Sequence, residues 1–189
     1  LKALEFLLNI HDLQVTDVFL NDINGGSFRL FVNHKGLKIE EPAQNRIDDL
    51  RKFENDLHLD TEKPYVEFVD KLSEEKQKLV SFLKNETKSG KIVYGYGAST
   101  KGATLLQYYG INNNLITAIA DRNPDKWGRI TIGTNIPIIS EDEARKNKPD
   151  YFLVLPWHFI EEFVQREKKF LREGGKFISP LPKFKIISE

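Results

Sequence analysis

KIVYGYGASTKG, at residues 91–102, is the stretch of this sequence that decides its fold. Residues 91–95 form a short apolar run that predicts a buried strand, and the glycines after it predict a turn. A helix follows over residues 100–109 and ends at Gly110, a residue type that favours the left-handed conformation after a helix. Strand, glycine turn and helix together form the opening unit of a doubly wound α/β fold.

The rest of the chain after this unit alternates in the same way. Further apolar runs predict four more strands, at residues 115–121, 136–139, 150–155 and 176–179. Helical patterns lie at residues 141–146 and 159–172. Near-continuous apolar strands joined by helices indicate a mostly parallel sheet that is covered on both faces. We therefore predict a Rossmann-like, doubly wound α/β domain with a five-stranded sheet over residues 91–189.

The N-terminal part of the chain, residues 1–60, has a different pattern. It predicts a helix over 2–12, a β-hairpin with strands at 14–23 and 27–33, and a polar connection with one short helix near 43–56. One helix and one hairpin are marginally stable alone, so this appendage must dock on the rest of the chain or on a missing domain. A long linker helix at residues 61–90 joins it to the α/β domain.

The composition excludes several classes of function. Lys plus Arg and Asp plus Glu number 28 each, so the chain lacks the basic surface that general nucleic-acid binding requires. There is no cysteine, and the four histidines lack metal-ligand spacing, so we expect no metal site. No apolar run reaches the roughly 18 residues of a membrane span. We expect a cytoplasmic protein without nucleic-acid or membrane contacts and, because methionine is absent, a fragment of a longer polypeptide.

The glycine turn, residues 95–102, is the first candidate site. Glycines let a ligand approach the backbone, and the N–H groups at a helix start favour an anion. The alternative is a turn that only packs the helix on the sheet, because a dinucleotide pattern would place glycine at position 100 and a P-loop would contain Gly-Lys-Ser/Thr. The candidate substrate-binding residues here are Gly95, Tyr96, Gly97, Ser99, Thr100 and Lys101.

Three further candidates follow the carboxyl ends of predicted strands, where ligands bind in such sheets. Asp121 stands where dinucleotide folds place an acid that binds ribose; the alternative is an aspartate that caps the turn at Asn123 and Pro124. Trp157 and His158 follow the fourth strand and could stack on a base and bond a phosphate. The alternative for this pair is a histidine at a helix start beside a tryptophan that covers the core.

The hairpin turn, residues 24–27, is the last candidate. Its sequence Asn24-Gly25-Gly26-Ser27, with Arg29 two residues beyond, is more than a minimal hairpin needs. Arg29 could pair with a phosphate or a carboxylate, and a plain hairpin turn with a surface arginine is the alternative. The sequence shows no set of nucleophile, base and orienting group, so it predicts no catalytic residue. The residues alone indicate a domain that binds a nucleotide or another phosphate-bearing ligand.

Several longer motifs occur in a fixed order along the chain. They are GYGASTKG at 95–102, LLQY at 105–108, DRNPDK at 121–126, GT at 133–134, IPI at 136–138, PDY at 149–151, LPWHF at 155–159, GGKFI at 174–178 and PLP at 180–182. Together with residues 14–32, these motifs closely resemble the C-terminal domain of the SAM-dependent sugar C-methyltransferases. The likeness spans nearly the whole chain.

The resemblance implies a protein of three modules: an N-terminal zinc-binding domain, a central SAM-binding methyltransferase domain and this C-terminal Rossmann-like domain. Residues 1–60 would then contain the last helix and hairpin of the central domain. The catalytic base, the SAM site and the zinc ligands would lie in the missing domains of the same polypeptide. We therefore expect this fragment to bind neither SAM nor zinc and to transfer no methyl group alone.

The implied reaction removes a proton beside the carbonyl of a nucleotide-linked keto-sugar, and the enolate carbon then attacks the methyl group of SAM. The implied role of this domain is to hold that substrate, with residues 95–101 at the diphosphate, Trp157 and His158 at the nucleotide, and residues 24–27 at the sugar. Two alternatives stay open: an NAD(P)-binding oxidoreductase domain, indicated by the glycine turn and Asp121, and a non-catalytic interaction module that pairs through helix 64–88. A homodimer is a further arrangement that the sequence leaves open.

Overall fold

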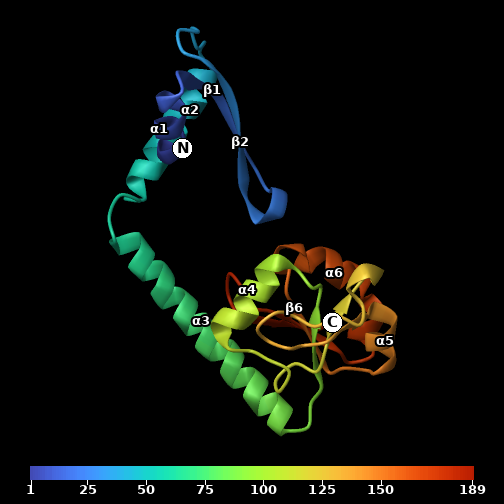
Figure 1. Ribbon diagram of the computed structural model, residues 1–189. Coiled ribbons are helices and arrows are strands. Elements are labelled where there is room, and N and C mark those ends of the chain that lie inside the picture. Colours follow the sequence, from blue (N-terminus) through green and yellow to red (C-terminus); the bar gives the residue numbers. More distant parts are fainter. The chain divides into compact units, whose positions relative to one another are not determined.

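The computed structural model describes all residues from 1 to 189 (Figure 1). The chain forms two compact units, which we call the N-terminal unit (Leu1–Asp70) and the C-terminal unit (Lys71–Glu189). The boundary falls inside the long helix α3 (Lys63–Lys88), which confirms the predicted helix at 64–88. None of the helices is both long enough and apolar enough to cross a membrane.

The N-terminal unit is built around an antiparallel hairpin. Strands β1 (Leu13–Asn21) and β2 (Ser27–His34) pair antiparallel from Leu13 opposite His34 to Asn21 opposite Ser27, with a shift of register between Val15 and Asp17. Helices α1 (Lys2–Ile10) and α2 (Ala43–Asp56) complete the unit, as the sequence predicted. Its buried hydrophobic core is small and consists of Leu1, Val15, Val18 and Ile47.

An ion pair fastens α2 to the hairpin. The guanidinium of Arg46 donates from Nε and Nη2 to the two carboxylate oxygens of Asp17, at 2.8 and 2.7 Å. The hydrogen bond from Arg46 is the main cause that holds the pKa of Asp17 below its ordinary value. The same guanidinium lies 4.5 Å from the centre of the Phe19 ring, an exposed cation–π contact.

The C-terminal unit contains a six-stranded sheet. Its strands in spatial order are β5 (Ile138–Ser140), β4 (Ile119–Asp121), β3 (Val93–Tyr96), β6 (Tyr151–Val154), β7 (Lys176–Ser179) and β8 (Lys185–Ile187). The first five run parallel, which confirms the Rossmann-like, doubly wound α/β prediction. The prediction of five strands was wrong by one, because β8 pairs antiparallel with β7 and is only three residues long, too short for an apolar pattern.

Both faces of this sheet are covered by helices (Figure 1). On one face, α3 and α4 (Thr100–Tyr109) pack with buried side chains such as Leu79, Leu83 and Leu106. The long helix is therefore part of this unit from Lys71 onward rather than a separate linker. The opposite face carries α5 (Glu141–Lys146), α6 (Ile160–Arg166) and α7 (Lys168–Arg172) over an aromatic core.

Two predicted elements differ from the structure. The helix expected at 159–172 is divided at Glu167, where α6 ends and α7 begins, because the Glu167 side chain is buried in a polar cluster under the helices. A short 3₁₀ turn at Trp157–Phe159 precedes α6. The strand expected at 115–121 is shortened to β4, because the N–H groups of Leu115 and Ile116 donate to the carbonyl of Asn112 in a turn.

Candidate functional site

The glycine turn lies between β3 and α4, at the carboxyl end of the parallel sheet. Gly97 has φ +81°, a left-handed conformation that favours glycine. A side chain at Gly97 would meet Pro156 Cδ at 2.9 Å, and one at Gly95 would meet Ile119 Cγ1 at 2.7 Å. Gly102 faces the Leu155 side chain in the same way. All three glycines are therefore required by protein packing, as in the alternative reading of this turn.

The start of α4 supplies the outward-facing polar groups of this turn. Ser99 is the N-cap of the helix, and its Oγ accepts a hydrogen bond from the Gly102 N–H at 3.1 Å. Thr100 and Lys101 follow in the first helical turn, and both side chains are exposed. The N–H groups of a first helical turn have no acceptor within the helix, so this end of α4 favours an anion.

Tyr96 does not face this end of α4. Its side chain is 1% exposed, and its hydroxyl donates to Glu167 Oε1 at 2.7 Å on the face covered by α6. Burial raises the pKa of the Tyr96 phenol well above its ordinary value, so it stays neutral. The Tyr96 side chain is therefore not available to a ligand at this end of the sheet, because it points into the core, and the predicted contact of Tyr96 with substrate falls to its backbone. Only its backbone reaches the carboxyl end of β3.

Asp121 at the end of β4 holds the glycine turn in shape. Its carboxylate accepts hydrogen bonds from the N–H of Ala98 at 2.7 Å and the N–H of Asn123 at 2.8 Å. Lys126 Nζ lies 3.2 Å from the same carboxylate and donates to the Ala98 carbonyl at 2.8 Å. The Asp121 carboxylate is therefore hydrogen-bonded to protein donors, which matches the turn-capping alternative. These bonds do not fit a cofactor whose ribose binds Asp121.

Lys126 is a site residue that sequence reasoning missed. It ties the loop after β4 to the glycine turn, and its side chain is 39% exposed. The available signal was its place at the end of the DRNPDK motif, five residues after Asp121. Nothing in that spacing predicts a bond to the Ala98 carbonyl, because that bond depends on the parallel pairing of β3 and β4.

The segment after β6, residues 156–159, closes over the glycine turn. Pro156 covers Gly97, and Trp157 is partly buried against the core beside α3 and α4. His158 lies near Lys101: burial first, and then the Lys101 charge, lower the pKa of the His158 imidazole. Its Nδ1 is buried and has no hydrogen-bond partner. The Pro156 contact therefore places this segment against the glycine turn, while Trp157 matches the core-covering alternative in part.

The hairpin turn, residues 24–27, belongs to the N-terminal unit. Asn24, Gly25 and Gly26 have φ values of +56°, +84° and +120°, which explains the residue types at these positions. The hydroxyl of Ser27 donates to the Ile23 carbonyl at 2.8 Å and closes the turn. Arg29 is exposed on β2, opposite Phe19. These contacts account for the turn as a structural element, and its role toward a ligand stays a prediction.

The chemistry that these groups support is binding. No three His, Cys, Asp or Glu side chains gather into an arrangement that could hold a metal ion. Around the glycine turn, the polar groups are the start of α4, the exposed side chains of Thr100 and Lys101, the partly exposed Lys126 and the partly buried His158. An α/β unit with a mostly parallel sheet and a glycine turn at the carboxyl end of its strands is a Rossmann-like domain.

Comparison with known proteins identifies the family of this domain. A family described as the C-methyltransferase C-terminal domain matches residues 22–182. The chain therefore belongs to the C-methyltransferase C-terminal domain family. It is also similar to C-methyltransferase NovU from Streptomyces niveus, with 34% identity over 189 residues, and this match covers the whole chain and 44% of that relative. The chain thus spans less than half the length of the curated relative that it matches.

Proposed function

We propose that this chain is the nucleotide-sugar-binding portion of a SAM-dependent C-methyltransferase. The observation that carries the proposal is geometric: Pro156, in the segment after β6, packs on Gly97 just before the start of α4, at the carboxyl end of the sheet, in a chain of this family. Ligands of open parallel sheets bind at that end. A diphosphate fits the first turn of α4 because that turn combines helix N–H groups with a lysine.

The roles follow from exposure and charge. Lys101 and the Thr100 N–H face the diphosphate, and the Ser99 hydroxyl, which accepts the Gly102 N–H, remains able to donate its own proton. His158 binds as a neutral imidazole at pH 7, because its pKa lies below the ordinary value. It therefore recognises the nucleotide by hydrogen bonding and contributes no charge. Trp157 contacts the nucleotide with the part of its ring that the core leaves uncovered.

The chemical step belongs to other parts of the polypeptide in this proposal. A base there takes the proton beside the carbonyl of the keto-sugar, and the resulting carbon nucleophile forms a C–C bond as the S–CH₃ bond of SAM breaks. The role of residues 71–189 is to fix the nucleotide end of the substrate, so that most of the binding energy comes from groups remote from the reacting carbon.

The N-terminal unit supports a second part of the proposal, a contact with the rest of the polypeptide. Its α1 and hairpin carry large apolar side chains that are more than 40% exposed, such as Phe6, Ile10 and Leu20. An apolar surface of this kind marks a contact surface. The relative of 34% identity has more than half of its length outside the match. We propose that the corresponding domains of this polypeptide cover the surface, with the turn at residues 24–27 and Arg29 beside the sugar.

Calorimetric titration of the chain with thymidine diphosphate tests the proposal. We expect weak, saturable binding that Lys101→Ala weakens by about tenfold, because a charged hydrogen bond to phosphate contributes on the order of 1.5–3 kcal/mol. Lys84→Ala, which removes an exposed lysine from α3, is the matched control and should leave binding unchanged. Absence of binding to any nucleoside diphosphate, with tryptophan fluorescence of the folded state intact, would reject the proposed role.

The oxidoreductase alternative is tested in the same titration with NADH. It requires Asp121 to bind ribose hydroxyls, and the bonds from Ala98, Asn123 and Lys126 already engage that carboxylate. We expect no enhancement of NADH fluorescence. A saturable enhancement that Asp121→Asn abolishes, without loss of the fold, would favour the dehydrogenase class instead.

A further inference from the structure

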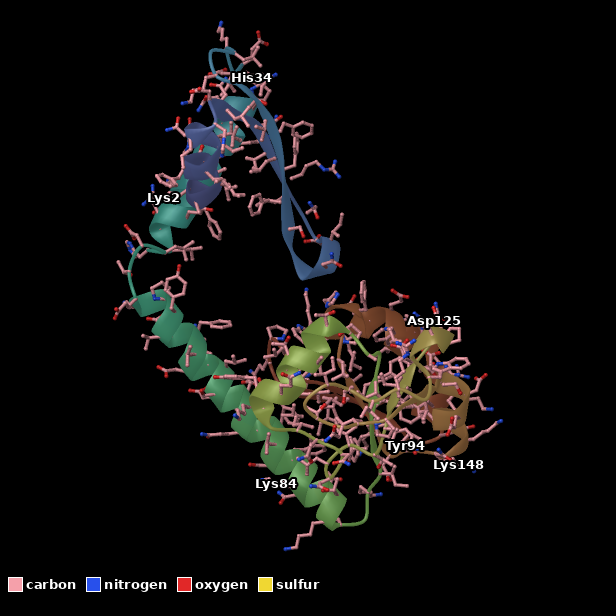
Figure 2. The ribbon with its side chains drawn as sticks, viewed as in Figure 1. Lys2, His34, Lys84, Tyr94, Asp125 and Lys148 are labelled. Atoms are coloured by element: carbon pink, nitrogen blue, oxygen red, sulfur yellow. The ribbon has the colours of Figure 1, made fainter.

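A charged cavity lies in the C-terminal unit, away from the glycine turn. It has a volume of about 920 Å³ and is bounded by α5, by α6 and α7, and by the loops that lead into β6 and β7. Those loops are at the amino ends of the parallel strands, whereas the glycine turn is at the carboxyl end of β3. We call this space the basic cavity. Figure 2 labels Lys148 at its mouth and Asp125 on the loop after β4, which lies on the carboxyl side.

The inner wall of the basic cavity is a buried polar cluster. Arg145 donates to Glu167 at 3.0 and 2.5 Å, and the Tyr96 hydroxyl bonds both Glu167 and Arg166. Arg166 Nη2 also donates to Glu141 at 2.6 Å. Burial alone would raise the pKa of Glu167, but the bonds from Arg145 and Tyr96 outweigh it and the pKa lies below the ordinary value. The two arginines and two glutamates therefore neutralise one another.

One donor in this wall has no acceptor. Nε of Arg166 is buried and makes no hydrogen bond, and its nearest carboxylate oxygen, on Glu167, is 3.7 Å away. A buried N–H group without an acceptor costs free energy, and native structures leave few of them. An oxygen atom of a bound anion at the inner end of the cavity would satisfy it.

The mouth of the cavity carries an excess of positive charge. Five cationic and three acidic side chains line the whole cavity, although the chain as a whole has no net charge. Of the acids nearest the mouth, Asp150 is engaged by Lys91 at 2.8 Å and by the Ile92 N–H at 2.8 Å. Lys146 and Lys148 are exposed, and neither forms an ion pair. Lysine is a flexible point charge that suits phosphate oxygens.

We propose that the basic cavity binds a phosphate-bearing small molecule, with Lys146 and Lys148 at its mouth and Arg166 at its inner end. The inference is independent of the nucleotide-sugar role, because it uses a different end of the sheet and different residues. The lining identifies a phosphate-class oxyanion, because one phosphate group carries enough charge and oxygen atoms to match two lysines that form no ion pair and a guanidinium N–H at once, whereas a monocarboxylate does not.

Amide-resolved NMR of the ¹⁵N-labelled chain, titrated with inorganic pyrophosphate, tests the site. We expect saturable shifts at Lys148, Glu173, Gly174 and Gly175, with a Kd that rises at least tenfold in Lys146→Ala/Lys148→Ala. The matched control is Lys84→Ala/Lys88→Ala, which removes two exposed lysines from α3; Lys84 lies on another side of the unit (Figure 2). Its Kd should stay within about twofold of the original.

Three results would overturn the inference: no saturable shift at these amides, equal weakening in both double variants, or the same shifts with chloride at matched ionic strength. The amides of residues 98–101 report separately on the glycine turn. Their silence would count against the nucleotide-sugar proposal and leave the basic cavity intact, so the two failures are distinguishable.

Discussion

The two units of the chain bury apolar surface to very different extents. Of the 29 buried hydrophobic residues, 25 lie in the C-terminal unit, although that unit holds fewer than two thirds of the chain. The large hydrophobic side chains that remain exposed show the opposite distribution, with 18 of 25 in the N-terminal unit. The C-terminal unit is thus stabilised by its own core, whereas the N-terminal unit presents apolar surface that suits a covering partner.

The largest expected effect tests whether stability resides in the C-terminal core. Phe152 is fully buried among aromatic rings, so Phe152→Ala should lower the free energy of unfolding by about 3–5 kcal/mol. Urea unfolding followed by tryptophan fluorescence measures this unit alone, because Trp127 and Trp157 both lie in it. Phe28→Ala, at a 43% exposed ring of the hairpin, is the control and should change the transition by less than about 0.5 kcal/mol. If both substitutions lowered the free energy of unfolding equally, the stability of the C-terminal unit would not depend on its aromatic core.

The next largest effect on folding stability is expected in the buried polar cluster around Glu167, where the effect should depend on pH. Glu167→Gln removes the carboxylate that Arg145 bonds at 3.0 and 2.5 Å and should cost about 2 kcal/mol at pH 7. Because the folded-state pKa of Glu167 is lowered, its contribution is complete above the unfolded-state value of about 4.3 and is lost as pH falls through the folded value. Urea midpoints of the original chain and of Glu167→Gln should converge at low pH. A constant gap from pH 7 to pH 3 would show that the carboxylate charge is not the cause.

Close packing of the glycine turn predicts a smaller loss of folding stability when a glycine there is replaced. A methyl group at Gly102 would overlap the Leu155 side chain, so Gly102→Ala should lower stability by about 1–3 kcal/mol. Thr104→Ala, on the exposed side of the same helix, should stay within about 0.5 kcal/mol. Thermal unfolding by circular dichroism compares the two variants. If Gly102→Ala left the thermal unfolding transition unchanged, α4 would be able to move away from β6.

The smallest effect on stability is expected where apolar surface is exposed. Phe6 and Ile10 on α1 are 71% and 61% exposed, so Phe6→Ser/Ile10→Ser should leave the tryptophan-monitored transition within about 0.5 kcal/mol. The same change should weaken any concentration-dependent self-association of the chain, because it removes apolar contact surface. Sedimentation velocity over a range of concentrations measures this. Unchanged association would mean that α1 does not contribute to contacts between molecules.

Local sequence signals predicted most of the fold. The helix at Thr100–Tyr109 was predicted to the residue, because Ser99 caps its start and Gly110 adopts the left-handed conformation after its end. Both signals act within a few residues, which is the range that a sequence pattern reports. The antiparallel strand β8 was missed because its three residues carry no pattern, and only pairing with β7 makes them a strand.

The sequence predicted where the site residues lie in the fold, but rarely which groups they bond. Lys101 and His158 follow the carboxyl ends of the neighbouring parallel strands β3 and β6, and their role toward a ligand stays a prediction. Tyr96 and Asp121 satisfied the same positional rule, yet the structure engages the first with Glu167 and the second with Ala98. The break between α6 and α7 had the same origin: a buried glutamate finds partners that are far away in sequence. Long-range hydrogen bonds of this kind depend on the packed fold and leave no local signal.

Strand β8 bears on how this chain avoids aggregation. The outermost strand of a sheet offers unpaired N–H and C=O groups that can recruit strands from other molecules, and apolar strands do so most readily. Without β8, the apolar residues Phe177 and Ile178 of β7 would stand at that open margin. The last residues of the chain occupy it and place Lys185 on the rim, a residue type that discourages further pairing. Strand β8 therefore covers an edge of β7 that would otherwise favour pairing with strands of other molecules.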